Sequence, residues 1–355
     1  MKIFFLINSL HTSGGTERVT TIIANELSKK GFEVGIIALH GGGSPFFELL
    51  DKIELFYINP SGYKSIYTHF LSNLYRLRII YVKHAPNIVI DVCSAMSLLS
   101  IPATIFTNIK VITWEHFNSN IDWNPITTPL SRYLAAKRSN MIITLTQRDA
   151  ENYKQRYKAL NVISISNPIT CNTNSQALLN QNIVLAIGRL TEQKGFDMLI
   201  KAWHLITKDN KNWKLRIVGG GEMETQLLEM IDFYHLNKTI ELLPPTNDVV
   251  SLYKNASIYV MSSRFEGLPL VLIEAMSMGL PIVSFDCETG PRELIENDVT
   301  GVLVPSNDIE KLASELNLLM NDKERQLRYG KNALLKSKDY EIEPIIKKWI
   351  DILCL

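Results

Sequence analysis

Two acidic residues stand out in the stretch SRFEGLPLVLIEAMSMGLPIV, residues 263–283. Glu266 comes just before an apolar run, and Glu274 lies inside it. Burying an unpaired carboxylate is costly, so a purely structural core helix has little use for Glu274. We therefore expect a polar partner or a ligand beside it.

Turn and helix signals around these residues place both acids at one helix N-terminus. Gly267 and Leu268 turn the chain after a strand, and Pro269 suits the first position of a helix that runs to about residue 278. Glu266 then lies at the mouth of the helix, and Glu274 leans back from one and a half turns inside. Free backbone N–H groups between them suit anionic oxygens.

A ligand that satisfies these groups carries hydroxyls for the two carboxylates and a phosphate for the backbone, which describes a nucleotide sugar. The structural alternative pairs Glu274 with a buried Arg or Lys and leaves Glu266 as a surface residue.

A basic loop follows the predicted strand NIVLAIG. Arg189 and Lys194 precede a helix that begins near residue 196. Two cations at a helix N-terminus oppose the local dipole, so a bound diphosphate would stabilise them. Simple solvation of two surface cations is the alternative.

Two glycine-rich loops also follow strands. Gly14 and Gly15, in SLHTSGGTERV, permit close approach of an anion to a helix start, although an ordinary strand-to-helix turn explains them equally well. Residues 219–221 form a second such loop, but Glu222 and Glu224 would repel a phosphate there. We expect the second loop to serve the conformation of the chain.

Short apolar runs alternate with segments of helical period, which is typical of parallel sheets covered by helices on both faces. Each half of the 355 residues has its own strand series, which predicts two doubly wound α/β domains of residues 1–168 and 182–338, joined by a linker of residues 169–181. The expected strands are KIFFLI, EVGIIAL, NIVIDV, KVITW, MIITLT and NVISIS, then NIVLAIG, KLRIVGG, TIELL, SIYVMS and PIVSF.

Composition excludes several classes of protein. The four cysteines form no C-x-x-C pair, which argues against a zinc site or a disulfide framework. The N-terminal apolar run is too short for a secretory signal, and no run approaches the ~18 residues of a membrane span. The formal net charge of +1 and the absence of a recognised motif argue against nucleic-acid binding. We expect a cytoplasmic protein.

Charge is unevenly divided along the chain. Residues 1–168 hold 17 Lys and Arg against 11 Asp and Glu, and residues 63–84 interleave cations with aromatic and aliphatic residues. Such a segment suits the anionic inner face of the cytoplasmic membrane, to which the protein would bind peripherally. The alternative is a solvated helix whose aromatic residues face the core.

With these residues in hand, the chain resembles the retaining glycosyltransferases of the GT-B fold, family 4. The resemblance implies two Rossmann-like domains that face each other across a cleft, with a C-terminal helix, residues 339–355, packing back on the first domain. The motifs that carry it are SGGTERV, WEHFN, IGRLTEQKGFDMLIKAW, LRIVGGGE, the two glutamates spaced as E-x7-E, and TGVLVPSND.

The resemblance also implies a role for each candidate residue. His116, in WEHFN, matches the family's active-site histidine, whereas a lone histidine after a strand is more often structural. The implied catalytic residues are Glu266, His116, Lys194 and Arg189. The implied donor-binding residues are Arg189 and Lys194 for the diphosphate, Glu266 for the hydroxyls of the transferred sugar, Glu274 for the ribose, and Gly14 and Gly15 near the phosphate and sugar. The backbone around Gly267, Leu268 and Pro269 would assist in binding the donor.

The expected activity is the transfer of a hexose or N-acetylhexosamine from a nucleotide diphosphate sugar, which is expected to be UDP-linked, with retention at the anomeric carbon. The expected acceptor is a hydroxyl of a lipid-linked glycan, in the assembly of O-antigen, capsule or a related polysaccharide. No metal or other cofactor is expected. Pro244 and Pro245 replace a glycine that commonly lies near the base, which leaves the base open. The alternatives are a nucleotide-sugar epimerase of the same architecture and a noncatalytic nucleotide-sugar binding protein.

Overall fold

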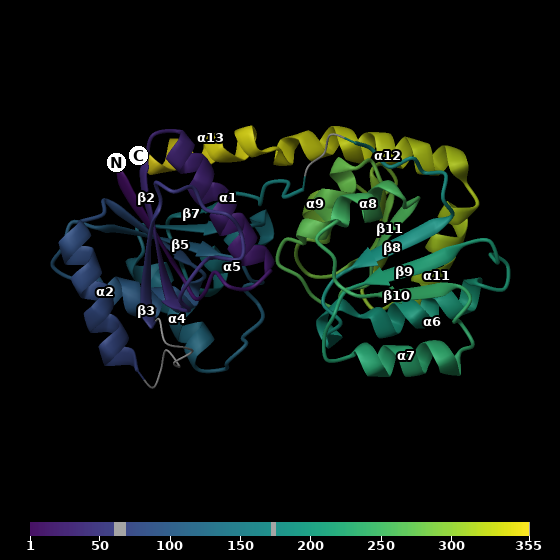
Figure 1. The fold of residues 1–355 in the computed structure, drawn as a ribbon, viewed down its shortest axis with the longest axis horizontal. Helices are drawn as coiled ribbons and strands as arrows, with labels where there is room; N and C mark the ends of the chain where they lie inside the picture. The colour runs from purple at the N-terminus through teal and green to yellow at the C-terminus, as the bar shows by residue number, and fades with distance from the viewer. Residues whose placement is uncertain (60–68, 172–174, 355) are drawn as a thin grey trace. The chain divides into compact units, whose positions relative to one another are not determined.

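The structure is a computed structural model that describes residues 1–59, 69–171 and 175–354 (Figure 1). The chain divides into two compact units. Unit 1 comprises Met1–Asn167 together with Glu343–Leu355, and unit 2 comprises Pro168–Ile342. Each unit has its own sheet and its own hydrophobic core, and each is described by itself.

Unit 1 is built on a seven-stranded parallel sheet in the order β3-β2-β1-β4-β5-β6-β7. Its central strands β1, β4 and β5 are buried except at the first residue of β1 and of β5, as expected for a parallel sheet covered on both faces. The strands are β1 (Lys2–Ile7), β2 (Glu33–His40), β3 (Glu54–Asn59), β4 (Ile88–Val92), β5 (Lys110–Glu115), β6 (Met141–Thr144) and β7 (Val162–Ser164).

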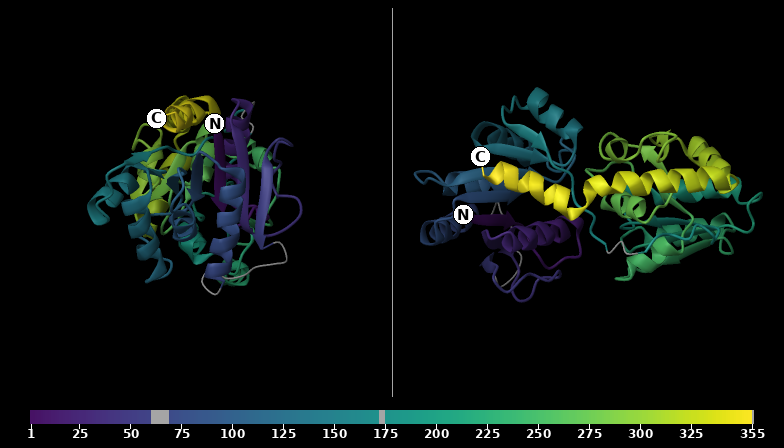
Figure 2. Two further views of the ribbon diagram at one scale, coloured as in Figure 1. Left: turned by 90° about the vertical axis from the view of Figure 1, so that its left-hand side faces the viewer. Right: turned by 90° about the horizontal axis from the view of Figure 1, so that it is seen from above.

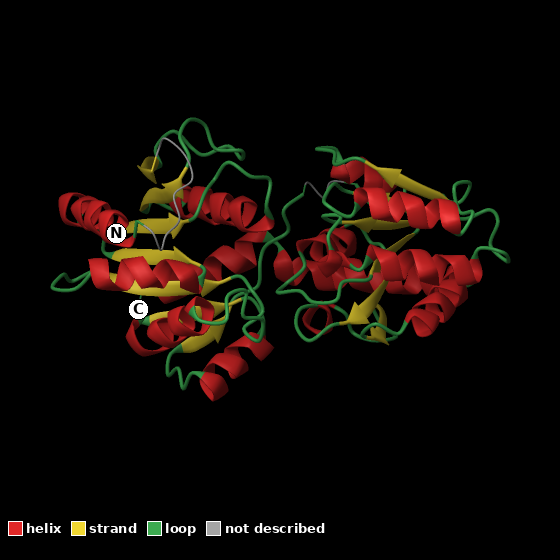
Figure 3. Ribbon diagram, turned by 90° about the horizontal axis from the view of Figure 1, so that it is seen from below, coloured by secondary structure: helices red, strands yellow, loops and turns green. Residues whose placement is uncertain are grey.

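Among the described residues, unit 1 has six helices. Figure 3 draws the helices in red and the strands in yellow. Helix α3 packs between α2 and α4. The six are α1 (Gly15–Lys29), α2 (Phe70–His84), α3 (Ser94–Ala103), α4 (Thr127–Arg138), α5 (Gln147–Arg156) and α13 (Ile342–Leu353).

Unit 2 has a six-stranded parallel sheet in the order β10-β9-β8-β11-β12-β13. Its strands are β8 (Ile183–Ile187), β9 (Lys214–Val218), β10 (Ile240–Leu243), β11 (Ile258–Met261), β12 (Ile282–Asp286) and β13 (Gly301–Pro305). Its helices are η1 (Glu192–Lys194), α6 (Phe196–Ile206), α7 (Glu224–Phe233), α8 (Val249–Lys254), α9 (Leu270–Ser277), α10 (Pro291–Leu294), α11 (Ile309–Met320), α12 (Lys323–Ser337) and η2 (Lys338–Tyr340).

Two parallel α/β sheets are confirmed, and all eleven expected strands are present. Strands β3 and β13, each of which forms an edge of its sheet, were not predicted from the sequence. An edge strand contacts only one neighbour and is less uniformly apolar than a central strand. The first four residues of β3 are not fully buried, and β13 begins with Gly301 and ends with Pro305. These features weaken the strand signal in the sequence.

Helix α13 packs through one apolar stripe on unit 1. Ile345, Ile346, Trp349 and Leu353 are buried, and the Trp349 ring meets the ring of Trp114 edge-on at a centroid distance of 4.8 Å. The yellow helix at the C-terminus in Figure 2 can be followed across this unit. The predicted return of the final helix to the first domain is therefore present in the fold.

The basic segment of residues 63–84 is only partly described, because Tyr63, Lys64 and Tyr67 lie outside the described residues. The described part is helix α2, which presents both predicted faces. Tyr81 is fully buried, whereas Tyr75 is 69% exposed. No helix in the described ranges is long and apolar enough to span a bilayer.

Replacing Trp349 with Ala should destabilise unit 1 strongly. The side chain is 1% exposed, and truncation of a buried Trp costs about 3–5 kcal/mol. Urea unfolding followed by circular dichroism should show an early transition that the exposed control Lys348→Ala lacks. Equal midpoints in the two variants would contradict this packing.

Candidate active site

A buried ion pair lies at the carboxyl edge of the sheet in unit 2. The Nζ atom of Lys194, at the end of η1, lies 2.6 Å from Oε1 of Glu266. Their side chains are only 16% and 7% exposed. Lys194 follows β8 and Glu266 follows β11, the two neighbouring strands at which the order of the sheet reverses. Ligands of open α/β sheets bind at this kind of reversal.

Two glycines make the pair possible. Gly195 has a φ of +63°, and a Cβ atom there would lie 2.1 Å from the carbonyl oxygen of Ser262. The Lys194 loop therefore approaches the end of β11 more closely than any other residue would allow. A Cβ atom on Gly188 would lie 3.2 Å from the aliphatic stem of Lys194, so Gly188 leaves room for that side chain.

A second ion pair, which was not predicted from the sequence, joins the same two loops. Arg264 donates to both carboxylate oxygens of Asp197, at 2.9 and 2.8 Å, and to the carbonyl oxygen of Glu192. A bidentate pair fixes orientation as well as distance. The partners lie 67 residues apart, and no local pattern in the sequence links them.

Arg189 is exposed, and its guanidinium donates to the side-chain oxygen of Gln193 at 3.3 Å. Gln193 in turn donates to the carbonyl oxygen of Phe265 at 3.0 Å. The structure thus places Arg189 on the loop that carries Lys194, while only Lys194 contacts Glu266 directly.

The carboxylate of Glu274 accepts from two hydroxyl groups. Thr170 Oγ1 donates to Oε1, and Tyr253 donates to Oε2 at 2.8 Å. Burial and the neighbouring carboxylate raise the pKa of Tyr253, so its phenol remains a donor. The polar partners expected for Glu274 are thus present. Both were missed, because Thr170 lies 104 residues away and Tyr253 is an ordinary apolar-face residue of a short helix.

The turn between the two glutamates leads directly into α9. Pro269 was predicted to be the first residue of the helix. It is instead the N-cap residue, because its ψ of 109° is extended, and the helix begins at Leu270. Within the described part of the chain, no acceptor lies against the backbone N–H groups of Gly267 and Leu268. Gly290 packs closely against this turn, since a Cβ atom there would lie only 2.5 Å from the carbonyl oxygen of Gly267.

The loop after β12 packs behind this turn. Thr289 donates its hydroxyl to the carbonyl oxygen of Glu266, and the Cys287 thiol is buried. Burial raises the pKa of Cys287 to about 12, and the charge of Glu266 adds to the rise. The thiol is therefore neutral beside the ion pair.

Residues 219–221 have the conformational role that was expected of them. Gly219 lies so close to Gly188 that a Cβ atom would meet its oxygen at 1.8 Å, and Leu190 donates its N–H to Gly220. This glycine loop supports the loop that carries Arg189.

In unit 1, Gly14 caps helix α1 and Gly15 is its first residue. The carboxylate of Glu17, in the first turn, accepts from Thr12 Oγ1 at 2.5 Å and lies over Gly14, where a Cβ atom would be 2.2 Å from Oε2. Gly14 therefore makes room for the chain's own carboxylate, which the sequence analysis did not foresee.

His116 follows β5 in unit 1 and is 7% exposed. Burial lowers its pKa to about 3, so the imidazole is neutral at physiological pH. Its ring lies 4.2 Å from the ring of Trp114, measured between centroids. A neutral imidazole offers one donor and one acceptor to a ligand.

The loop that carries His116 is held by a buried guanidinium. Arg132, from α4, is 1% exposed and donates to the carbonyl oxygens of Asn118, Ser119 and Ile121 and to the carboxylates of Glu115 and Asp122. All of these acceptors lie within eight residues of sequence. The loop is therefore fixed in position.

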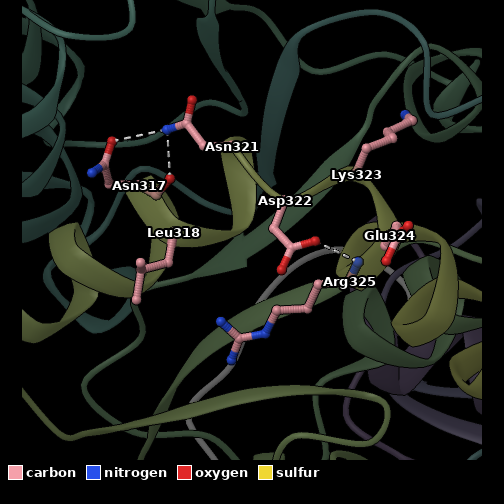
Figure 4. A pocket seen from close by; sticks show the side chains of 7 residues that line it. All are labelled: Asn317, Leu318, Asn321, Asp322, Lys323, Glu324 and Arg325. Atoms are coloured by element: carbon pink, nitrogen blue, oxygen red, sulfur yellow. Dashed lines mark hydrogen bonds between the residues drawn. The ribbon is translucent and has the colours of Figure 1, made fainter.

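Figure 4 shows the side chains that line a hollow at the turn between α11 and α12 in unit 2. Its volume is about 460 Å³. Asp322 caps α12 by accepting from the N–H of Arg325, and Asn321 donates to the side chain and backbone of Asn317. These polar groups stabilise the turn. Helix α11 runs away from the carboxyl end of β13, so the hollow lies at the other end of the unit from Lys194.

Comparison with known proteins identifies the family. A model of the glycosyl transferases group 1 matches residues 172–336, and a model of glycosyltransferase family 4 matches residues 13–172. Over 353 residues the chain is 38% identical to an uncharacterized glycosyltransferase of Haemophilus influenzae, with 99% of each chain covered. The chain belongs to these glycosyltransferases.

Two further relatives match this chain over nearly its full length. The amylovoran biosynthesis glycosyltransferase AmsD of Erwinia amylovora is 30% identical, with 99% of each chain covered. A Campylobacter jejuni enzyme is 28% identical, with 99% of this chain and 98% of the relative covered. Its name is GalNAc-alpha-(1->4)-GalNAc-alpha-(1->3)-diNAcBac-PP-undecaprenol alpha-1,4-N-acetyl-D-galactosaminyltransferase.

Solved structures share the fold. Staphylococcus aureus TarM, solved with fondaparinux, alpha-GlcNAc-glycerol and UDP, has a TM-score of 0.82 at 16% identity, with 99% of each chain covered. Anabaena HepE, solved with UDP and glucose, has a TM-score of 0.81 at 19% identity, with 100% of this chain and 99% of HepE covered. The glycosyltransferase therefore has the GT-B fold.

The buried His116 should make folding stability depend on pH. The pKa of His116 is about 3 in the folded protein and 6.5 for an exposed imidazole. Its contribution to the free energy of unfolding is therefore complete above about pH 6.5 and is lost as the pH falls toward 3. Asp91, whose pKa burial raises to about 7, acts in the opposite direction over this range. The test must therefore compare the parent with His116→Gln.

Between about pH 7.5 and 5.5, the stability advantage of the parent over His116→Gln should shrink by about 1.4 kcal/mol. Urea unfolding at the two pH values measures this difference. A constant advantage would show that His116 is not buried as the neutral imidazole.

Proposed function

We propose that this glycosyltransferase moves a hexose or N-acetylhexosamine from a UDP-sugar to a hydroxyl of a lipid-linked glycan, with retention at the anomeric carbon, in the assembly of a bacterial surface polysaccharide. The observation that carries the proposal is the buried Lys194–Glu266 pair at the reversal of the sheet in unit 2. An ammonium held beside a carboxylate suits a ligand that joins a diphosphate to a hydroxylated sugar.

Each end of the donor has matching groups in unit 2. Lys194 and the exposed Arg189 would bind the diphosphate, and the N–H groups of Gly267 and Leu268 would add backbone donors at the start of α9. Glu266 would accept hydrogen bonds from the transferred sugar. Glu274, which already accepts from two hydroxyls, would exchange a partner for the ribose hydroxyls.

These groups would act mainly by electrostatics. As the bond from the anomeric carbon to the diphosphate oxygen breaks, negative charge gathers on the diphosphate, where Lys194, Arg189 and the helix N-terminus stabilise it. The acceptor oxygen forms the new bond on the same face, and its proton passes to the departing diphosphate. These cations supply the neutralisation, so we propose that the reaction needs no metal ion.

In unit 1, the neutral His116 would donate to or accept from a sugar hydroxyl, and the glycines at positions 14 and 15 would lie near the phosphate and sugar. The carboxylate of Glu17 over Gly14 would have to move before an anion could approach there.

Relatives support the choice of donor and acceptor. TarM and HepE were solved with UDP, and the Campylobacter relative is named for an undecaprenol-linked acceptor. Membership of two glycosyltransferase families favours transfer over the epimerase and the noncatalytic binding protein.

A lipid-linked acceptor implies contact with a membrane, and helix α2 has a suitable surface. Leu71, Tyr75, Ile79 and Val82 are all exposed at helical spacing along it. The Arg76 and Arg78 side chains donate to backbone carbonyl oxygens, which leaves Lys83 as the exposed cation of the last turn. We propose that this stripe contacts an anionic membrane surface.

Lys194→Ala should weaken UDP binding about 10- to 100-fold, because it removes a charge-assisted hydrogen bond to the diphosphate. Isothermal titration with UDP measures this loss. Lys214→Ala is the matched control, since Lys214 also lies 2.6 Å from a glutamate, Glu241, but at the amino end of a strand in the same unit. EDTA should leave the affinity of the parent unchanged.

Equal UDP affinity for Lys194→Ala, Lys214→Ala and the parent would refute the donor site, and loss of binding in EDTA would refute metal independence.

Replacing Leu71, Tyr75 and Ile79 together with Ser should lower binding to vesicles with about 30% anionic lipid at least tenfold at low salt. Sedimentation with the vesicles measures the bound fraction. A triple Ser variant of the exposed Leu318, Leu327 and Leu335 in unit 2 is the control. Unchanged binding of the α2 variant, or no binding by the parent, would rule out this membrane surface.

A further inference from the structure

The chain passes between its two units twice, and the two connecting segments are hydrogen-bonded to each other. The first passage follows Asn167, and the second precedes Glu343. The N–H group of Ile169 in the first segment donates to the carbonyl oxygen of Tyr340 in the second at 2.7 Å. This contact lies within unit 2 and holds the first connecting segment beside the second.

The next residue, Thr170, joins the same segment to Glu274. Its Oγ1 atom donates to Oε1 of Glu274 in α9, while the phenol of Tyr253 in α8 donates to Oε2 at 2.8 Å. Glu274 is only 4% exposed, and a buried carboxylate is costly unless hydrogen-bond donors surround it. The connecting segment therefore supplies a hydroxyl that stabilises the carboxylate.

These two hydroxyl groups differ in how easily they can leave the carboxylate. Tyr253 is fully buried in a helix, and its ring lies 5.9 Å from the ring of Tyr259, measured between centroids. Thr170 is partly exposed and lies outside the helices and strands of unit 2. Rotation about one side-chain bond moves the threonine hydroxyl, whereas the packing of its ring fixes the phenol. Thr170 is thus the partner that a ligand can displace.

We propose that Thr170 competes with the nucleotide for Glu274. In the free protein its hydroxyl binds the carboxylate, and the ribose hydroxyls of the donor displace it and release the connecting segment of residues 168–171. The inference deepens the proposed function and rests on it, because it names the group that leaves Glu274 when the ribose binds. Donor binding is thereby coupled to the segment that joins the two units.

The competition has a sign that separates it from a supporting role. A ribose hydroxyl that replaces the hydroxyl of Thr170 gains only the difference between two similar hydrogen bonds. Removing the competing hydroxyl should therefore raise the affinity for the nucleotide. A residue that only supported Glu274 would lower that affinity, or leave it unchanged, when it was replaced.

Isothermal titration of the full chain with UDP tests this sign. Thr170→Val keeps the shape of the side chain and should bind UDP about 3- to 10-fold more tightly than the parent. Thr170→Ser retains the hydroxyl and should restore the affinity of the parent. The matched control is Thr207→Val, since Thr207 is also partly exposed and donates to a side chain, that of Thr239, but at the C-terminal end of α6.

The analogue 2′,3′-dideoxy-UDP identifies the ribose as the competitor. It lacks both ribose hydroxyls, so the parent and Thr170→Val should bind it equally. The inference is overturned if Thr170→Val binds UDP no more tightly than Thr170→Ser, or if it gains as much affinity for the analogue as for UDP. No binding of UDP by any of these proteins would overturn the donor site, and the inference with it.

Hydrogen exchange of the Ile169 amide measures the release of the connecting segment. Saturating UDP should speed exchange at least threefold in a peptide of the parent that contains Ile169, because the segment is no longer held through Thr170. In Thr170→Val the exchange should already be fast without UDP. Unchanged or slower exchange in the parent with UDP would overturn the release.

Discussion

The ion pair between Lys194 and Glu266 is the contact on which the candidate site depends. Two charges buried at the edge of a sheet are stable only when they are close together and well oriented, because each loses its hydration. The parallel sheet provides this closeness, since β8 and β11 are neighbours although 70 residues lie between the end of β8 and the start of β11. Gly195 and the Arg264–Asp197 pair then set the distance between the two loops.

The two units prepare their polar groups in different ways. In unit 2, Lys194 is paired with Glu266, Glu274 with two hydroxyls and Arg189 with an amide oxygen, so a donor can replace existing partners one at a time. In unit 1 the side-chain nitrogens of His116 and Asn118 that are unpaired among the described residues follow β5 and are neutral, and a single buried arginine holds their loop. The first arrangement suits a charged leaving group, and the second suits hydroxyl groups.

Much of this organisation was predictable from the sequence. Periodicity located the central strands, and the unusual carboxylates and cations indicated the loops after β8 and β11. The edge strands β3 and β13 were missed because a strand with a single neighbour needs less apolar character. Arg264, Tyr253, Arg132 and Glu17 were missed for another reason: their roles arise from tertiary contacts or from a side-chain rotamer, which no spacing in the sequence records.

The most direct test of the central claim is a crystal structure of the glycosyltransferase soaked with intact UDP-N-acetylglucosamine. Our account predicts that the diphosphate lies within hydrogen-bond distance of Lys194 Nζ and that a hydroxyl of the sugar donates to Glu266. In the contrary result, the donor binds far from these residues and leaves the 2.6 Å contact between Lys194 and Glu266 intact. That result would show that the ion pair has only a structural role.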